Sequence, residues 1–158
     1  YSSAASDVYK RQIHAPTHRM TQPWFFKIYK GKSKDVLCEI IQKIDKEKYS
    51  AVKINKFIDK VKSSDTIISV CMTKDESNRV PEWEEIAAVS MAVQNMWLSC
   101  YVNDIGSYWS TPALKDDYAK HSGLNSNQKS LGFFFMGSYK HFETPKVREG
   151  LDSKVEWV

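Results

Sequence analysis

The pattern of apolar and polar positions is most informative between Pro81 and Thr111. It predicts one long helix from Pro81 to about Asn103, because proline suits a first helical position and three glutamates follow where the helix dipole is positive. Beyond the first turn the apolar residues do not keep to one stripe. One face carries Trp83, Ile86, Ala87, Ser90, Gln94, Trp97 and Tyr101, and another carries Val89, Val93, Met96 and Cys100. A helix that is apolar nearly all round is buried, so we expect the rest of the chain to be organised around this one.

Shorter apolar runs predict the other elements. Strands are expected at residues 24–29, 66–72, 106–110 and 130–136, and further helices at 34–46, 51–61 and 111–121. Ser33 and the pair Thr111-Pro112 are expected to open two of these helices, and residues 155–158 could form a terminal strand. The order of elements predicts an α+β or α/β sandwich around one mixed sheet.

Composition narrows the function classes. A net charge of +4, with most lysines mixed among acids between Lys27 and Lys62, is too mild to indicate a nucleic-acid partner. Cys38, Cys71 and Cys100 are widely separated, so no spacing suits a disulfide framework or a metal site. The sequence carries no signal peptide and no transmembrane run. We therefore expect a cytoplasmic protein with no membrane partner.

The usual catalytic motifs are absent from the sequence. It contains no GxGxxG, GxSxG, HExxH or CxxC, and its four histidines (His14, His18, His121 and His141) lie in polar segments where a surface position is the default interpretation. A chain without a set of catalytic side chains is either a binding protein or an enzyme whose cofactor carries the chemistry. The residues alone leave both open.

Several segments, in order, resemble the FMN-dependent nitroreductase family. APTHRMTQPWFF at residues 15–26 resembles the family's first flavin-contact loop, and residues 82–111 resemble its core dimer helix with the flavin-contact turn that follows. SLGFFFMGSY at 130–139 is similar to the next strand, and VREGLDSKVEWV at 147–158 to the C-terminal arm. The closest likeness is to the short, single-domain branch. The resemblance implies an α+β three-layer sandwich with a mixed central sheet and the long helix buried at a dimer interface.

The resemblance also implies a homodimer with two FMN molecules at the subunit interface. His14 and His18 match positions that reach the partner's FMN, Trp109, Ser110 and Thr111 match a segment along the flavin within the subunit, and Arg148 matches a position that meets the phosphate. A dianionic phosphate seeks histidine, arginine or backbone N–H groups, which suits these residue types. Ser110 and Thr111 could instead only cap the next helix.

The resemblance assigns nicotinamide-cofactor contact to Ser99, Cys100, Tyr101, Val102, Asn103 and Asp104. It implies an oxidoreductase that passes a hydride from NADH or NADPH through flavin N5 to an electron-poor acceptor (a nitroaromatic, quinone or enone) by a ping-pong mechanism. No catalytic side chain and no metal is then required, because the flavin carries the chemistry. The alternative is a flavin-binding protein for storage or sensing that does not turn over.

The first residues are interpreted separately. SSAASDVYKRQ at residues 2–12 resembles a translated sequencing adapter, so we expect residues 1–12 to be a non-native or disordered tail and residues 13–158 to be one nitroreductase-like domain. The family's first helix, whose Arg-Arg-Ser motif grips the phosphate, is expected to be missing from this fragment. Losing two charge-assisted hydrogen bonds would weaken FMN binding by roughly 10²- to 10⁴-fold.

Overall fold

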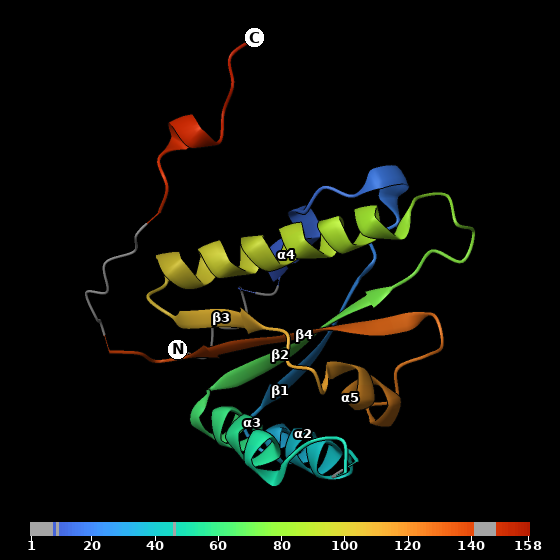
Figure 1. Ribbon diagram of the computed structural model, residues 1–158, viewed down its shortest axis with the longest axis vertical. Helices are drawn as coiled ribbons and strands as arrows, with labels where there is room; N and C mark the ends of the chain where they lie inside the picture. The colour runs from blue at the N-terminus through green and yellow to red at the C-terminus, as the bar shows by residue number, and fades with distance from the viewer. Residues whose placement is uncertain (1–7, 9, 46, 141–147) are drawn as a thin grey trace.

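A four-stranded sheet lies between one long helix and a layer of three shorter helices. The computed structural model describes residues 8, 10–45, 47–140 and 148–158. Helix α4 covers one face of the sheet, and α2, α3 and α5 cover the other (Figure 1). The predicted α+β sandwich is confirmed. The elements are η1 Arg11–His14, η2 His18–Met20, β1 Trp24–Lys30, α2 Ser33–Gln42, α3 Ala51–Ser63, β2 Thr66–Thr73, α4 Glu82–Val102, β3 Gly106–Ser110, α5 Lys115–His121, β4 Gln128–Gly137 and η3 Leu151–Ser153.

The two predicted helix starts are wrong in detail. Ser33 is already helical, and its hydroxyl closes the preceding turn by accepting from the Lys30 N–H at 2.7 Å and donating to the Lys30 carbonyl. Thr111 and Pro112 precede α5 without capping it, because a separate turn, closed by the Lys115 N–H on the Pro112 carbonyl, comes first. In both places a hydrogen bond within a local turn forms instead of the predicted helix cap.

The prediction of a mixed sheet is wrong for the described strands. The strand order is β1-β2-β4-β3, and each neighbouring pair is antiparallel. The connections explain this result. Two helices join β1 to β2. The chain therefore re-enters the sheet at the end where β1 finished, and β2 runs antiparallel to β1. One helix joins β2 to β3, so these strands run the same way, but β4 lies between them and is antiparallel to both.

The sheet separates two apolar clusters. Alternate residues of β4 point to opposite faces, as the period of a strand requires, so Phe133 and Phe135 pack toward α2, α3 and α5 while Phe134 and Met136 pack toward α4. Of the two faces predicted for α4, the second is its core face, since Val89, Val93, Met96 and Cys100 are at most 1% exposed. Strand β2 is buried on both faces, which explains its continuous apolar sequence.

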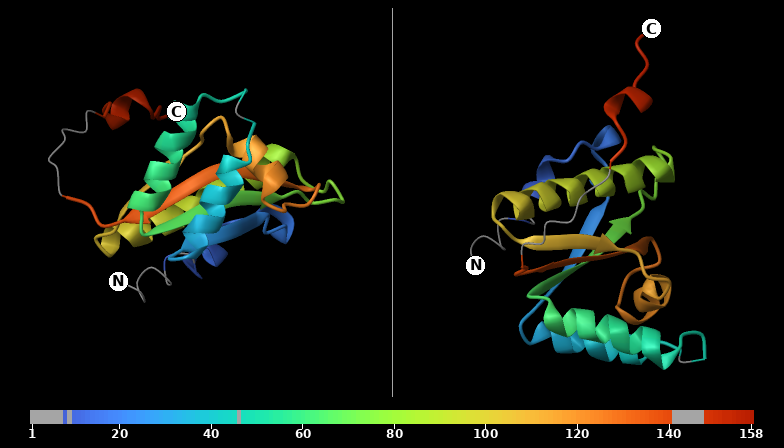
Figure 2. Two further views of the ribbon diagram at one scale, coloured as in Figure 1. Left: turned by 90° about the horizontal axis from the view of Figure 1, so that it is seen from below. Right: turned by 60° about the vertical axis from the view of Figure 1, so that its left-hand side comes forward.

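The chain ends bear on two predictions. Of the tail predicted at 1–12, residues 1–7 and 9 lie outside the described residues, while Val8 is buried in the cluster beneath α4. The terminal strand suggested at 155–158 is not formed among the described residues, because this segment stands apart from the sheet (Figure 2). Trp157 is 94% exposed there.

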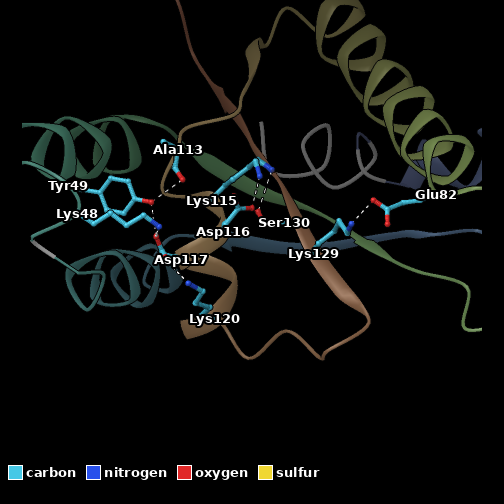
Figure 3. Close-up of polar contacts among 11 residues, drawn as sticks. Lys48, Tyr49, Glu82, Ala113, Lys115, Asp116, Asp117, Lys120, Lys129 and Ser130 are labelled. Carbon is cyan, nitrogen blue, oxygen red and sulfur yellow. Dashed lines mark hydrogen bonds and ion pairs between the residues drawn. The ribbon is translucent and has the colours of Figure 1, made fainter.

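Asp117 ties α5 to the loop between α2 and α3. Its carboxylate accepts hydrogen bonds from Lys120, Lys48 and the Tyr49 hydroxyl, each at 2.6 Å, and the same hydroxyl lies 3.1 Å from the Ala113 carbonyl oxygen (Figure 3). Lys120, Lys48 and Tyr49, in that order of effect, hold the pKa of Asp117 well below its ordinary value. The network positions α5 beside Phe133 of β4. It therefore supports β4, the strand after which the chain continues to its C-terminal segment.

Replacing Asp117 with asparagine should flatten the acid limb of the stability profile. A carboxylate with a lowered folded pKa stabilises the protein above its unfolded pKa of 3.8, and that stability is lost as the pH falls below about 4 toward the folded value. Urea melts between pH 7 and pH 2 should therefore show a smaller acid loss for Asp117→Asn than for the wild type. Asp116→Asn, an exposed neighbour, is the control. Parallel wild-type and Asp117→Asn profiles would contradict the assignment.

Candidate functional site

The outer face of α4 is the main exposed apolar surface of the described chain. Figure 1 shows α4 as the outermost layer on its side of the sheet. The expectation that this helix is buried nearly all round is therefore wrong for a single chain. Large apolar side chains remain exposed along it: Trp83 (68%), Met91 (38%), Trp97 (39%), Leu98 (53%), Tyr101 (80%) and Val102 (81%). A contiguous patch of this kind marks a binding surface.

Two hollows flank Leu98 on the C-terminal half of α4. One, of about 520 Å³, is lined by His14, Asn95, Leu98, Ser99, Val102 and Asn103. The other, of about 340 Å³, is lined by Gln94, Trp97, Leu98, Tyr101 and Arg148. The fold thus brings His14 and Arg148, which are 134 positions apart (148 − 14), to either side of one leucine. A cation, a histidine, amides and aromatic rings meet there.

The segment predicted to contact a nicotinamide cofactor does not form one surface. Ser99 reaches the hollow beside His14, and Tyr101 and Val102 are exposed, but the Cys100 side chain is fully buried in the core. Burial raises the pKa of that thiol. The Asn103 amide donates to the Ser99 carbonyl at 2.8 Å and closes the last turn of α4. Asp104, in a left-handed conformation, accepts from the Tyr139 hydroxyl at 3.2 Å. The Cys100 side chain therefore cannot contact a surface ligand.

His18 lies at the opposite end of α4. Its Nδ1 pairs with the carboxylate of Glu84 in the first turn of the helix. Beside this pair is a hollow of about 370 Å³ lined by Pro16, Thr17, His18, Trp83, Glu84, Ala87, Ala88 and Met91. The two predicted histidines thus occupy different hollows along one helix.

Trp109, Ser110 and Thr111 lie at the end of β3, the sheet edge opposite β1. Trp109 is half-buried and packs with the cluster beneath α4, and its Nε1 is buried without a hydrogen-bond partner among the described residues. Ser110 is half-buried and Thr111 is exposed. Neither caps α5, which removes the alternative reading of these two residues. The ring is held by its packing against this cluster, and its buried N–H gains no hydrogen bond from the described residues.

The structure therefore divides the predicted residues into two groups. The histidines lie on the η1–η2 segment, which contacts α4 and leads into edge strand β1, whereas Trp109 to Thr111 lie on the other edge strand. None of these three residues lines the hollows that contain His14, His18 or Arg148. Sequence reasoning did not select Glu84 and Trp97, which line these hollows, although helical spacing had placed Trp97 on the same face as Gln94 and Tyr101.

Comparison with known proteins identifies the family. A family model described as "Nitroreductase family" matches residues 3–138. The chain belongs to the nitroreductase family. Family membership makes it an oxidoreductase. Two curated relatives carry the provisional name NAD(P)H nitroreductase. YdjA of Escherichia coli (strain K12) is 24% identical over 84% of this chain and 74% of its own length, and YfhC of Bacillus subtilis (strain 168) is 27% identical over 94% and 78%.

Solved structures confirm the nitroreductase-like fold. A nitroreductase-like family protein from Bacillus cereus superposes with a TM-score of 0.88, at 22% identity, over 100% of this chain and 85% of that one. A structure from Desulfovibrio desulfuricans, described as a nitroreductase in complex with FMN, gives a TM-score of 0.73 at 19% identity over 98% and 83%. Within the described part of this nitroreductase-family chain, no helix could span a membrane and no cluster of His, Cys, Asp or Glu could hold a metal ion.

The residues of the α4 hollows suit FMN in chemical type. Arg148 and His14 can meet a phosphate, and Trp97, Tyr101 and Leu98 supply flat or apolar walls for an aromatic ring. The amides of Gln94 and Asn103 offer donors to polar ring edges. The donor set therefore fits the cofactor, and the hollows of the single chain are open to solvent.

Proposed function

We propose that this protein is an FMN-dependent homodimeric oxidoreductase that uses NADH or NADPH to reduce an electron-poor acceptor. The acceptor would be a nitroaromatic, a quinone or an enone, and the two substrates would bind in turn by a ping-pong mechanism. One observation carries the proposal: the exposed apolar face of α4 holds His14 and Arg148 on either side of Leu98. When bound, FMN would supply the hydride and two-electron chemistry that links the nicotinamide to the acceptor.

The homodimer is supported by the spacing along α4. Glu84, Ala87, Met91, Gln94, Leu98 and Tyr101 recur every three or four residues on the outward face, which is the period of a helix seam. Two such faces packed together would cover the exposed rings and enclose the hollows. They would also place the histidines of one chain toward Trp109, Ser110 and Thr111 of its partner. Gln94 is exposed in the single chain, as expected for a residue that hydrogen-bonds across the seam.

Each residue has a distinct part in this proposal. Arg148 and His14 would hold the phosphate by charge-assisted hydrogen bonds, and Trp97 with Trp109 would confine the ring. Ser110 and Thr111 present hydroxyls to the polar edge of the ring. Ser99, Val102 and Asn103 border the space for the nicotinamide. The packed α4 faces exclude water, which strengthens these contacts and suppresses competing reactions.

The cytoplasm is the compartment we propose. All three cysteines are free and buried, which suits a reducing environment where NAD(P)H is also present.

A visible spectrum of the purified full-length protein tests the function. We expect a flavin absorption band that survives dialysis, at about one FMN per chain, and that bleaches rapidly on adding NADH or NADPH. The ratio of the two bleaching rates gives the nicotinamide preference. A bound flavin that stays oxidised with both donors would favour the alternative of a flavin-storage or sensing protein. A colourless protein that takes up no added FMN would exclude both functions.

A further inference from the structure

The loop that carries His18 has an unusual backbone. Arg19, Met20 and Gln22 all have positive φ angles (50°, 55° and 44°), a region that residues other than glycine rarely enter. The Thr17 hydroxyl accepts the Gln22 N–H at 3.1 Å and lies 3.2 Å from the Thr21 hydroxyl, so it closes the loop on itself. Three left-handed residues in four positions persist only where the surroundings demand them, and such strain gathers at functional sites.

The loop holds one side chain against α4. The short helix η2, which begins with His18, lies next to the first turn of α4 (Figure 1). There Nδ1 of His18 pairs with Glu84. The histidine ring is 56% exposed and the Glu84 side chain is 23% exposed. Nε2 of His18 has no partner in the described part of the chain. The adjoining hollow, with Trp83, Ala87 and Met91, is apolar apart from the loop and the His18–Glu84 pair.

We propose that Glu84 is a positioning residue for His18, and that Nε2 of His18 gives a proton to the electron acceptor as the acceptor is reduced beside the flavin ring of the partner subunit. This inference rests on the proposed function. An ionised carboxylate only accepts hydrogen bonds, so Glu84 keeps the proton on Nδ1 and directs Nε2 outward. It accepts from Nδ1–H whether or not Nε2 carries a proton, so the ring stays oriented through a full cycle. The same division of labour orients the histidine of a hydrolase triad.

The reaction balances with a quinone as acceptor. Each two-electron reduction adds a hydride equivalent from the bound cofactor and one proton to the quinone. The carbonyl π bond breaks, an O–H bond forms with the proton from Nε2, and His18 regains a proton from solvent. A positioned general acid typically accelerates such a step by about 10²- to 10⁴-fold. An acceptor that takes only electrons, such as hexacyanoferrate(III), needs no proton and should be indifferent to His18.

The test compares two acceptors in the full-length protein pre-reduced with NADH. The measured quantity is the ratio of the stopped-flow reoxidation rates with a benzoquinone and with hexacyanoferrate(III). We expect this ratio to fall about 10²-fold in His18→Gln and about 10-fold or more in Glu84→Gln. Glu82→Gln is the matched control, because Glu82 lies in the same helical turn and pairs with Lys129 instead. Its ratio should equal that of the wild type.

A long-range proton–nitrogen NMR spectrum provides the second readout. His18 should show a protonated Nδ1 in the wild type and in Glu82→Gln, and a mixture of tautomers in Glu84→Gln. Equal acceptor ratios in Glu84→Gln and Glu82→Gln, with reduction by NADH intact, would overturn the inference and leave the proposed function standing. An unchanged tautomer in Glu84→Gln would also overturn it. A wild-type protein that NADH and NADPH do not reduce would overturn the function and the proton transfer together.

Discussion

Replacing Leu98 with aspartate is expected to give a monomer that retains little FMN. Leu98 is the shared wall of the His14 and Arg148 hollows and is 53% exposed in the single chain. In the proposed dimer this carboxylate would be withdrawn from water, and pairing with His14 or Arg148 would take that side chain away from the phosphate. We expect a cost of about 4 kcal/mol, which corresponds to about 10³-fold in the dimer dissociation constant. The flavin would be lost with the dimer, because the hollows of one chain do not enclose it.

Light scattering coupled to gel filtration, with flavin absorbance recorded on the same peak, measures both effects. Val52→Asp is the matched control, since Val52 is 64% exposed on α3 in the layer on the opposite face of the sheet. That variant should remain a yellow dimer. A Leu98→Asp protein that is dimeric at micromolar concentration and holds one FMN per chain would show that α4 is not the interface.

The sequence predicted those parts of the fold that local periodicity determines. The spacing separated two apolar faces of α4 and did not say which one faces the core; burial shows that it is the face with Val89, Val93 and Met96. The continuous apolar run of β2 identified a strand covered on both faces. The pairing of strands could not be read in this way. Strand pairing depends on where each helical connection returns the chain to the sheet, and that is a property of the whole chain.

The candidate site was predictable as a set of segments, and its geometry was not. The family motifs selected His14, His18 and Arg148, but the contact of His18 with Glu84 spans 66 positions and leaves no local signal. The resemblance assigned the whole segment 99–104 to cofactor contact, whereas helical rotation turns Cys100 inward with Val89, Val93 and Met96. In each case a segment was found and the direction of the side chain was set by tertiary packing.

Gly132 is expected to be the least replaceable glycine of the described chain. It adopts φ +119° on β4, beside the bulge where Leu131 is the extra residue opposite β2. A Cβ there would lie 2.4 Å from the Ser110 carbonyl oxygen and 3.1 Å from Nε1 of Trp109. Neither neighbour can move freely, because Ser110 is paired in the sheet and the Trp109 ring packs beneath α4.

Gly132→Ala should therefore destabilise the protein by about 3 kcal/mol or more, since backbone strain and overpacking add. For a chain of this size that lowers Tm by about 10 °C. Gly31→Ala is the control: it shares a positive φ of +57°, but nothing lies within 4 Å of its Cβ position, so it should cost only about 1 kcal/mol. Thermal melts of both variants compare strain with and without the clash. Equal melting temperatures would mean that the end of β3 can move, and Trp109 would then not be a fixed wall for a bound ring.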